Sequence, residues 1–391
     1  MIKPGRKDAA ARAAAMLASA LLVLQAPLAA LAGPREQAKR LHDRIAGVPP
    51  SDSVLTAMAA KIQSGDTAGA AAMATDNPNF YNVTLKNFVA PWTNRAMTVF
   101  VPLNDYTATV IGMIRDDVDF RQVLTGDILY TSNASGAPGY SPANNDHYQY
   151  LDDNNVDLKS TLVQTTQSSL LGIPPEATAG VITTRSAAEA FFIAGTNRAM
   201  FRFTLINYMC RDMNQVLDIT RAPDRIRQDV SRSPGGDSRV FLNNCIGCHS
   251  GMDPMAQAFA YYNFNATTGR LEYTAGTVQP KYLINSDNFK AGYVTTSDAW
   301  ENRWRAGQNS LMGFDAAMPA TGNGAKSLGA EFANSDAFAE CQVEKVFKAV
   351  CLRDPSNDAD RAEVATMTAS FKSDYKMKKV FADAGVYCMG Q

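Results

Sequence analysis

Histidine is scarce in this chain, and the three histidines, His42, His147 and His249, lie far apart in the sequence. Their spacing gives no basis for a catalytic triad, and no other set of catalytic residues stands out, so we predict none. Two cysteines precede His249, but a structural zinc site usually has four ligands. The nearest other histidine, His147, is 102 residues away, which argues against zinc here.

The chain also lacks an excess of positive charge and, beyond its first 32 residues, any long apolar run. Its 37 Lys and Arg against 38 Asp and Glu give a formal net charge of −1. This balance provides no electrostatic footprint for nucleic acid, so we expect no nucleic-acid partner. No segment after residue 32 is apolar over the length needed to cross a bilayer, so we expect no transmembrane span in the mature chain.

The first 32 residues have the three parts of a secretory signal peptide. The stretch MIKPGRKDAAAR is basic, and the apolar stretch AAAMLASALLVLQAPLAALA ends in an A-x-A sequence at Ala32. An uncleaved membrane anchor is the alternative, but Gln25 and Pro27 interrupt the apolar run. We therefore predict a signal peptide over residues 1–32, cleavage near Ala32 and a periplasmic location.

The stretch FLNNCIGCHSGMDP contains the motif C-x-x-C-H, formed by Cys245, Cys248 and His249. In a c-type haem site the two sulfurs bind the haem vinyl groups and the adjacent histidine ligates the iron. A thioredoxin-like motif would follow a strand and open a helix, whereas the flanks here are a Pro/Gly-rich loop and a predicted turn, SGMDPM. We therefore expect one covalent haem c, with His249 as the proximal iron ligand.

The other axial position of the iron is predicted to be occupied by Met318, in the loop GFDAAMPATGNG. Met318 lies 69 residues after His249 and directly before a proline, and a methionine ligand suits electron transfer. In the alternative, Met318 only fills a gap in the core. Other candidates for this position stay open, as does an empty position: Met312, Met255, Met252 and His147. Of these, Met252 and Met255 are too close to His249 in sequence to reach the opposite face of the haem.

Four cysteines lie outside the motif: Cys210, Cys341, Cys351 and Cys388. In an oxidising compartment they are expected to form two disulfides. There are three ways to pair them, and the sequence does not choose among these.

The segment CIGCHSGMDPMAQAFAYYNFNATTGRLEY resembles the haem segment of the planctomycete-type cytochrome c family. The matching positions after the motif are Asp253, Pro254, Asn263, Phe264, Gly269 and Arg270. The stretch RLHDRIAGVPPSDSVLTAMAAKI and the C-terminal stretch from FAECQVEKVF onward resemble the helical ends of the same family. Met255-Ala256 departs from the family pattern of a larger aliphatic residue and glycine. The resemblance implies a helical fold and a haem, and it does not imply a reaction.

The apolar pattern predicts a mainly α protein in which a multi-helical N-terminal region precedes a cytochrome c-like haem domain. Residues 33–235 are expected to form a helical domain with long polar loops. Within it, 35–130 is predicted to be helical and 131–180 to be surface loop or a domain boundary. A capping-box pattern at Ser186 is expected to open one apolar helix over 186–210.

Residues 236–391 are the predicted haem domain. The helix with the C-x-x-C-H motif, the loop of Met318 and a helix over 337–351 are expected to enclose the porphyrin. Aromatic residues of this region are expected to be ordinary core and, in the alternative, to wall the haem: Tyr261, Tyr262, Phe264, Trp300 and Trp304. Arg303 and Arg305 are expected to be solvated, with pairing to haem propionates as the alternative.

These residues favour an electron-transfer protein whose partners are other redox proteins or an exported redox complex. The alternatives are a haem enzyme or small-ligand sensor with an open distal site, and a haem-bearing subunit of a larger exported complex. A two-haem peroxidase is disfavoured because the chain has one motif. The polar segment 144–157 has a composition that suits Ca²⁺, but it lacks the glycine and ligand spacing of a calcium loop.

Overall fold

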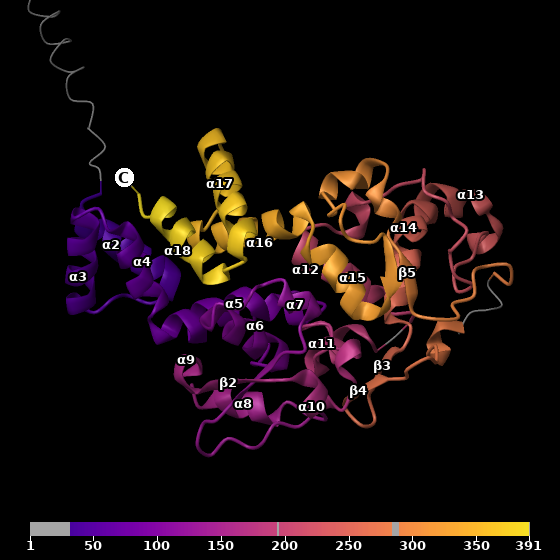
Figure 1. Cartoon of the computed structure of the whole chain (residues 1–391), viewed down its shortest axis with the longest axis horizontal. Helices are drawn as coiled ribbons and strands as arrows, with labels where there is room; N and C mark the ends of the chain where they lie inside the picture. Colours follow the sequence, from indigo (N-terminus) through magenta and orange to yellow (C-terminus); the bar gives the residue numbers. More distant parts are fainter. Residues whose placement is uncertain (1–31, 194, 284–288, 391) are drawn as a thin grey trace, which may run out of the picture.

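The computed structural model describes residues 32–193, 195–283 and 289–390 (Figure 1). The predicted signal peptide falls almost entirely outside these residues. The described chain is mainly helical, with three two-stranded antiparallel sheets, which confirms the predicted mainly α class. Within the described ranges, no helix is long and apolar enough to cross a membrane.

The first and last helices of the described residues lie side by side, as the indigo and yellow ribbons of Figure 1 show. The helices of this region are α2 (Pro34–Ala46), α3 (Asp52–Gln63), α4 (Thr67–Thr75), α16 (Asp336–Cys351), α17 (Asp358–Asp374) and α18 (Met377–Cys388). Helix α18 packs on α2 and α4. Side chains of Gln37, Arg40 and Arg44 on α2 donate hydrogen bonds to the backbone carbonyls of residues 388–390. These bonds satisfy carbonyls that a helix end leaves free.

The region over 131–180, predicted to be surface loop or a domain boundary, contains regular structure and is therefore not a continuous loop. The elements are β1 (Leu129–Ser132), α8 (Asp146–Asp153), α9 (Leu158–Thr161), β2 (Leu162–Thr165) and α10 (Gln167–Leu171). Strands β1 and β2 pair antiparallel and pack on α6 (Asp105–Arg115). The polar composition is real, but buried side chains such as Tyr148 and Leu151 anchor the segment to the core. Among the described residues, no group of three or more metal-binding side chains is found, here or elsewhere.

The single helix predicted over 186–210 is two helices, α11 (Arg185–Phe191) and α12 (Arg198–Met209). Gly195 and Asn197 between them have positive φ angles of 62° and 57°, which a continuous helix does not allow. The cap of α11 is Thr184, whose hydroxyl accepts a hydrogen bond from the Ala187 amide at 3.4 Å, rather than Ser186. The break places the start of α12 beside the predicted haem motif.

The C-x-x-C-H motif lies on a continuous helical run over residues 238–259. It consists of α13 (Ser238–Val240), a π-helical turn η6 (Phe241–Cys245), α14 (Ile246–Ala256) and a 3-10 turn η7 (Gln257–Phe259). The predicted turn SGMDPM is therefore wrong, because Pro254 lies inside α14. Proline removes one helical hydrogen bond, and α14 ends two residues later, so the helix tolerates it.

Short strands and one further helix follow α14 in the sequence and lie in the right half of Figure 1. They are β3 (Tyr262–Asn265), β4 (Arg270–Tyr273), β5 (Ala299–Glu301), β6 (Thr321–Asn323) and α15 (Gly324–Ala333). Strand β3 pairs with β4 and β5 pairs with β6, and β5 packs against α14. Strand β5 and the 3-10 turn η9 (Arg303–Arg305) form the wall against which α14 packs.

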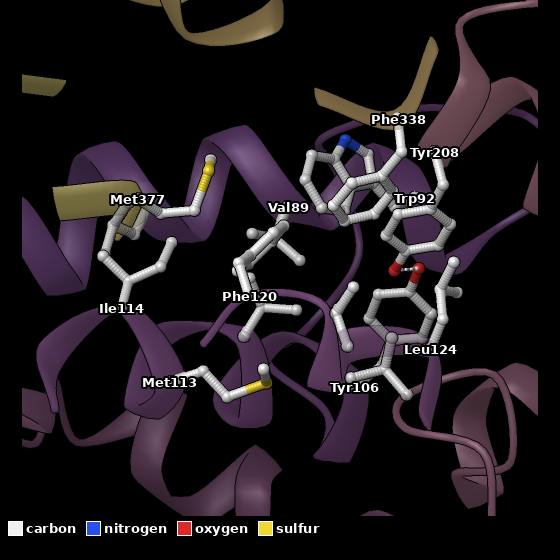
Figure 2. Close-up of a cluster of buried hydrophobic side chains, with 14 of the residues drawn as sticks. Val89, Trp92, Tyr106, Met113, Ile114, Phe120, Leu124, Tyr208, Phe338 and Met377 are labelled. Carbon is white, nitrogen blue, oxygen red and sulfur yellow. Dashed lines mark hydrogen bonds between the residues drawn. The ribbon is translucent and has the colours of Figure 1, made fainter. Parts of the chain in front are cut away.

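One hydrophobic core extends over elements from both predicted domains. In Figure 2 the hydroxyls of Tyr106 and Tyr208 meet at 2.5 Å, and Phe338 of α16 stacks on Tyr208. Helices before and after residue 235 therefore share this core. The boundary at 235 stays a prediction, as does the cytochrome c-like arrangement of residues 236–391.

The four cysteines outside the motif form two disulfides, Cys210–Cys341 and Cys351–Cys388. This is one of the three pairings that the sequence left open. The first joins α12 to α16, and the second joins α16 to the end of α18. Disulfides persist in oxidising compartments, so the two disulfides indicate an extracytoplasmic location, as predicted.

Candidate haem site

Cys245 and Cys248 are unpaired and half-buried, whereas the other four cysteines are bonded to each other. They lie at the junction of η6 and α14. The Cys248 sulfur is 3.6 Å from the Met213 carbonyl. Burial, together with neighbouring Cys245, raises the pKa of the Cys248 thiol. The two thiols therefore remain available for a bond to another group.

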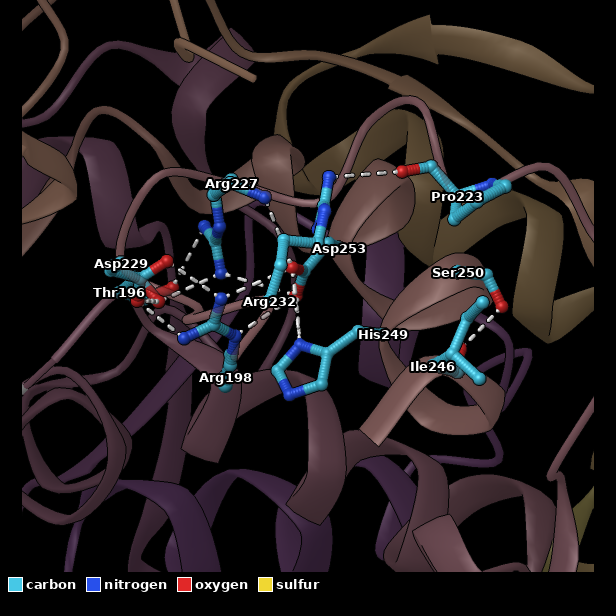
Figure 3. Close-up of polar contacts among 10 residues, drawn as sticks. All are labelled: Thr196, Arg198, Pro223, Arg227, Asp229, Arg232, Ile246, His249, Ser250 and Asp253. Atoms are coloured by element: carbon cyan, nitrogen blue, oxygen red, sulfur yellow. Dashed lines mark hydrogen bonds and ion pairs between the residues drawn. The ribbon is translucent and has the colours of Figure 1, made fainter. Parts of the chain in front are cut away.

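His249 holds one ring nitrogen toward the protein and the other away from it. Its Nδ1 atom is 3.2 Å from each carboxylate oxygen of Asp253. Figure 3 shows the second nitrogen, Nε2, directed away from this carboxylate, and Nε2 has no hydrogen-bond partner among the described residues. A metal-binding histidine typically has this arrangement, with its other nitrogen bound to a carboxylate.

The other two histidines are buried, and each uses both ring nitrogens. In His42, Nδ1 is 2.8 Å from the Val48 carbonyl and Nε2 is 3.3 Å from the Asn77 amide. In His147, Nε2 accepts a hydrogen bond from the Ser132 amide at 3.0 Å, and Nδ1 is 2.6 Å from the Pro138 carbonyl. His147 is therefore unsuited to ligate iron in this fold, and His249 is the histidine that offers a free nitrogen.

Asp253 is fully buried and is surrounded by cationic groups. Arg198 donates to it through Nε at 2.9 Å and Nη2 at 3.1 Å, and Nη2 of Arg227 lies 3.6 Å from Oδ1 (Figure 3). Burial raises the pKa of Asp253, but the charges of Arg198 and Arg227 and the contact with His249 outweigh it and hold that pKa well below its usual range. Asp253 is therefore a carboxylate that accepts from the histidine.

Arg198 and Arg227 are themselves held by further partners. Arg198 donates to both oxygens of Asp229, at 2.5 and 2.8 Å. The fully buried Arg227 donates to the hydroxyl of Thr196 at 2.7 Å and to its carbonyl at 3.2 Å. We call Arg198, Arg227, Asp229 and Asp253 the Asp253 cluster. It ties the start of α12 and the segment 226–229 to α14.

Apolar side chains lie exposed beside the cysteines. Leu242, three residues before Cys245 on the same helical run, is 54% exposed, and Ile219 is 70% exposed. Leu217 is also exposed, and its Cβ lies 3.5 Å from the point where a side chain on Gly247 would begin. Exposed apolar surface next to two thiols and a free imidazole nitrogen suits a flat apolar macrocycle. The residues present therefore fit a haem.

Met318 is half-buried in the loop before β6, where its amide donates to the Asp315 carbonyl at 3.0 Å. Two links connect this region to the motif. Asn309 donates to the Val216 carbonyl at 3.0 Å, and the Asp218 amide donates to the carbonyl of Gly247 at 3.0 Å. These links bring Asn309, nine residues before Met318, close to the segment that contacts the motif helix. Ligation by Met318 stays a prediction.

The other predicted methionine candidates are buried in the protein core: Met252, Met255 and Met312. The first two lie on α14, the helix that also carries His249. A ligand on the opposite face of a haem must come from another element, so α14 itself does not supply it. Met312 lies in the 3-10 turn η10 (Gln308–Met312).

Arg303 and Arg305 are engaged by carboxylates, which neither prediction for them anticipated. Arg303 pairs with Asp224 and Glu301, and Arg305 donates to both oxygens of the buried Glu331, at 2.8 and 2.6 Å. They are therefore not free to bind propionates. The predicted aromatic residues are buried, as expected for ordinary core.

The Asp253 cluster was not predicted from the sequence. The spacing of His249 and Asp253, four residues apart, would have revealed their contact if the segment had been read as helix. Arg198 and Arg227 are 55 and 26 residues from Asp253 in sequence, and no local pattern marks them.

Comparisons with protein-family models, with curated proteins and with solved structures found no match to this chain. The planctomycete-type resemblance therefore depends on the residues quoted above and stays a prediction. The case for a haem site depends on the geometry of Cys245, Cys248 and His249.

Proposed function

We propose that this protein is an exported single-haem c-type cytochrome that acts in electron transfer. One observation carries the proposal. His249, the histidine with a free ring nitrogen, directly follows the two unpaired cysteines and is oriented by a buried carboxylate. Its partners would be other redox proteins or an exported redox complex.

Each residue of the site has a distinct role in this proposal. Haem c, when bound, supplies a one-electron couple. Cys245 and Cys248 would hold the macrocycle through thioether bonds, and Nε2 of His249 would ligate the iron. Asp253 fixes the ring orientation by accepting from Nδ1. The exposed side chains of Leu217 and Leu242 would pack on the apolar surface of the haem and exclude water from that contact.

Met318 is the proposed sixth ligand. Its place in a half-buried loop before a proline supports this role, because such a loop positions a thioether without relying on helix packing. A methionine ligand raises the reduction potential, which suits a carrier.

Covalent attachment can be tested by producing the exported protein together with a haem-attachment system. After extraction with acidified acetone, the wild-type protein should retain one haem per chain by its pyridine haemochrome spectrum. The double variant Cys245→Ala/Cys248→Ala should lose it. The matched control is Asn244→Ala, at an exposed position next to Cys245, which should retain haem. Equal haem in all three proteins, or none in the wild type, would reject the proposal.

A second candidate function is a haem enzyme or small-ligand sensor with an open distal site. The His249–Asp253 contact favours it, since a carboxylate partner raises the basicity of the ligating histidine. Carbon monoxide or peroxide should then bind rapidly without prior loss of a ligand. In the electron carrier, binding should be slow and should require displacement of Met318.

A further inference from the structure

The Asp253 cluster places four charged side chains behind the proposed haem ligand, of which Arg227 and Asp253 are buried and Arg198 and Asp229 are half-buried. Burying charges costs free energy that pairing only partly returns, so a buried ion cluster is weak grounds for a purely stabilising role. Within the described residues, His249 is the titratable group that the cluster contacts and that faces the motif surface. This placement suggests that the cluster acts on the histidine.

The geometry divides the Arg198 guanidinium between two carboxylates. Its Nε and Nη2 atoms donate to Asp253, while Nη1 and Nη2 donate to Asp229. Such a two-sided arrangement fixes the position of the guanidinium and, through it, the carboxylate that faces His249. Arg227 adds a second positive charge 3.6 Å from the same Asp253 oxygen that Arg198 Nε contacts.

Two opposing effects therefore meet at Nδ1 of His249. A carboxylate acceptor makes the imidazole a stronger electron donor, which stabilises ferric iron and lowers the potential. Cations on that carboxylate withdraw negative charge from it and weaken the effect. The balance between them depends on how tightly Arg198 holds Asp253.

We propose that Asp253 is a positioning residue for His249 and that Arg198 sets the haem reduction potential by limiting how strongly Asp253 accepts from Nδ1. This inference rests on the proposed haem function. It assigns to the cluster the control of the potential, and therefore of the direction of electron flow with a given partner.

The test is the midpoint potential of the haem-loaded, full-length protein, measured by optical titration. Asp253→Asn keeps an acceptor for Nδ1 and removes the charge, so the potential should rise. Arg198→Gln leaves the carboxylate less compensated, so the potential should fall. We expect each change to shift the ratio of oxidised to reduced haem at fixed ambient potential about tenfold, which is about 59 mV for a one-electron couple.

The matched control is Arg202→Gln, on the same helix α12, whose guanidinium pairs with Asp212 at 2.6 Å and is half-exposed. In Arg202→Gln, the ratio of oxidised to reduced haem at fixed ambient potential should differ from that of the wild type by less than twofold. Arg198→Lys keeps the positive charge but loses the forked donors of the guanidinium. Its midpoint potential should lie between those of the wild type and Arg198→Gln. If Arg198→Gln does not fold, Arg198→Lys takes its place in the test. The g values of the ferric haem in electron paramagnetic resonance should move with the potential in both cluster variants.

The outcomes separate the two proposals. If the wild type holds no covalent haem, the proposed function fails and the inference with it. If haem is retained but Asp253→Asn and Arg198→Gln or Arg198→Lys shift the potential no more than Arg202→Gln does, the inference alone is overturned. Opposite shifts for the two cluster residues support it.

Discussion

The indole of Trp304 lies directly against the backbone of Gly251 on α14. A Cβ at residue 251 would come within 2.0 Å of the Trp304 Nε1 atom, and Trp304 is fully buried. The helix with the proposed haem motif therefore approaches its wall more closely than any side chain at this position would allow. Its position against the 3-10 turn η9 (Arg303–Arg305), which contains Trp304, depends on this glycine.

Gly251→Ala should destabilise the protein through this contact. The added methyl group must displace a buried indole, which costs about 1–3 kcal/mol of unfolding free energy. The control is Gly247→Ala on the same helix, where the new Cβ would meet its nearest atom at an ordinary 3.5 Å. Because both changes gain the same helix propensity, urea unfolding should show a loss for Gly251→Ala that Gly247→Ala lacks. Equal stability of the two variants would rule out this close contact.

The two disulfides should contribute unequally to stability. Cys210–Cys341 closes a separation of 131 residues and Cys351–Cys388 one of 37. On the loop-entropy model, the longer link stabilises by about 1 kcal/mol more than the shorter. Urea unfolding of Cys210→Ala/Cys341→Ala and Cys351→Ala/Cys388→Ala should show the larger loss for the first. A larger loss for the second would mean that the loop-entropy term does not decide the order.

Lys281 should make stability depend on pH in the alkaline range. Burial lowers the pKa of Lys281 from 10.5 to about 7, with only a partial offset from Glu272. Between these values the unfolded chain binds more protons than the folded chain, so the unfolding free energy rises with pH. The penalty for burying the charge is fully present below pH 7 and is relieved as pH approaches 10.5.

Lys281→Met should remove this rise. Urea unfolding at pH 7 and pH 9 should show a smaller increase for Lys281→Met than for the wild type, because the variant has no charge to lose. The control is Lys290→Met, at an exposed lysine nearby in the sequence, which should keep the wild-type increase. The same increase in all three proteins would show that Lys281 is not the source.

Met318→Leu should change the ligation of the iron if Met318 is the sixth ligand. Ferric haem with a methionine ligand has a weak long-wavelength absorption band, and this band should disappear. Met312→Leu, a change of the same type at a buried methionine in η10, should leave the band intact. Loss of the band in Met312→Leu alone would move the assignment to that residue.

Cys245, Cys248 and His249 lie together on one helical run, as predicted, because they are close neighbours in the sequence and such local structure can be predicted from local patterns. Their role in binding haem stays a prediction. The paired cysteines were predicted as a group, but their connectivity depends on how α12, α16 and α18 pack, which local patterns do not contain.

The errors have identifiable physical causes. Pro254 suggested a turn, yet a proline near the end of a helix costs only a single hydrogen bond. Residues 186–210 are largely apolar, and the polar stretch at 195–198 was interpreted as part of one helix, so the positive φ angles of Gly195 and Asn197 that separate α11 from α12 were missed. That break places Arg198 next to Asp253, and contacts between distant segments of this kind become visible only in the folded chain.

The central claim, a haem bound covalently at Cys245 and Cys248, is tested most directly by mass spectrometry of the motif peptide. Trypsin cuts after Arg239 and next after Arg270, so one peptide, residues 240–270, contains both cysteines and His249. In the exported protein this peptide should have the mass of its sequence plus one haem. The peptide mass without haem, whether as two free thiols or as a disulfide, would contradict the account.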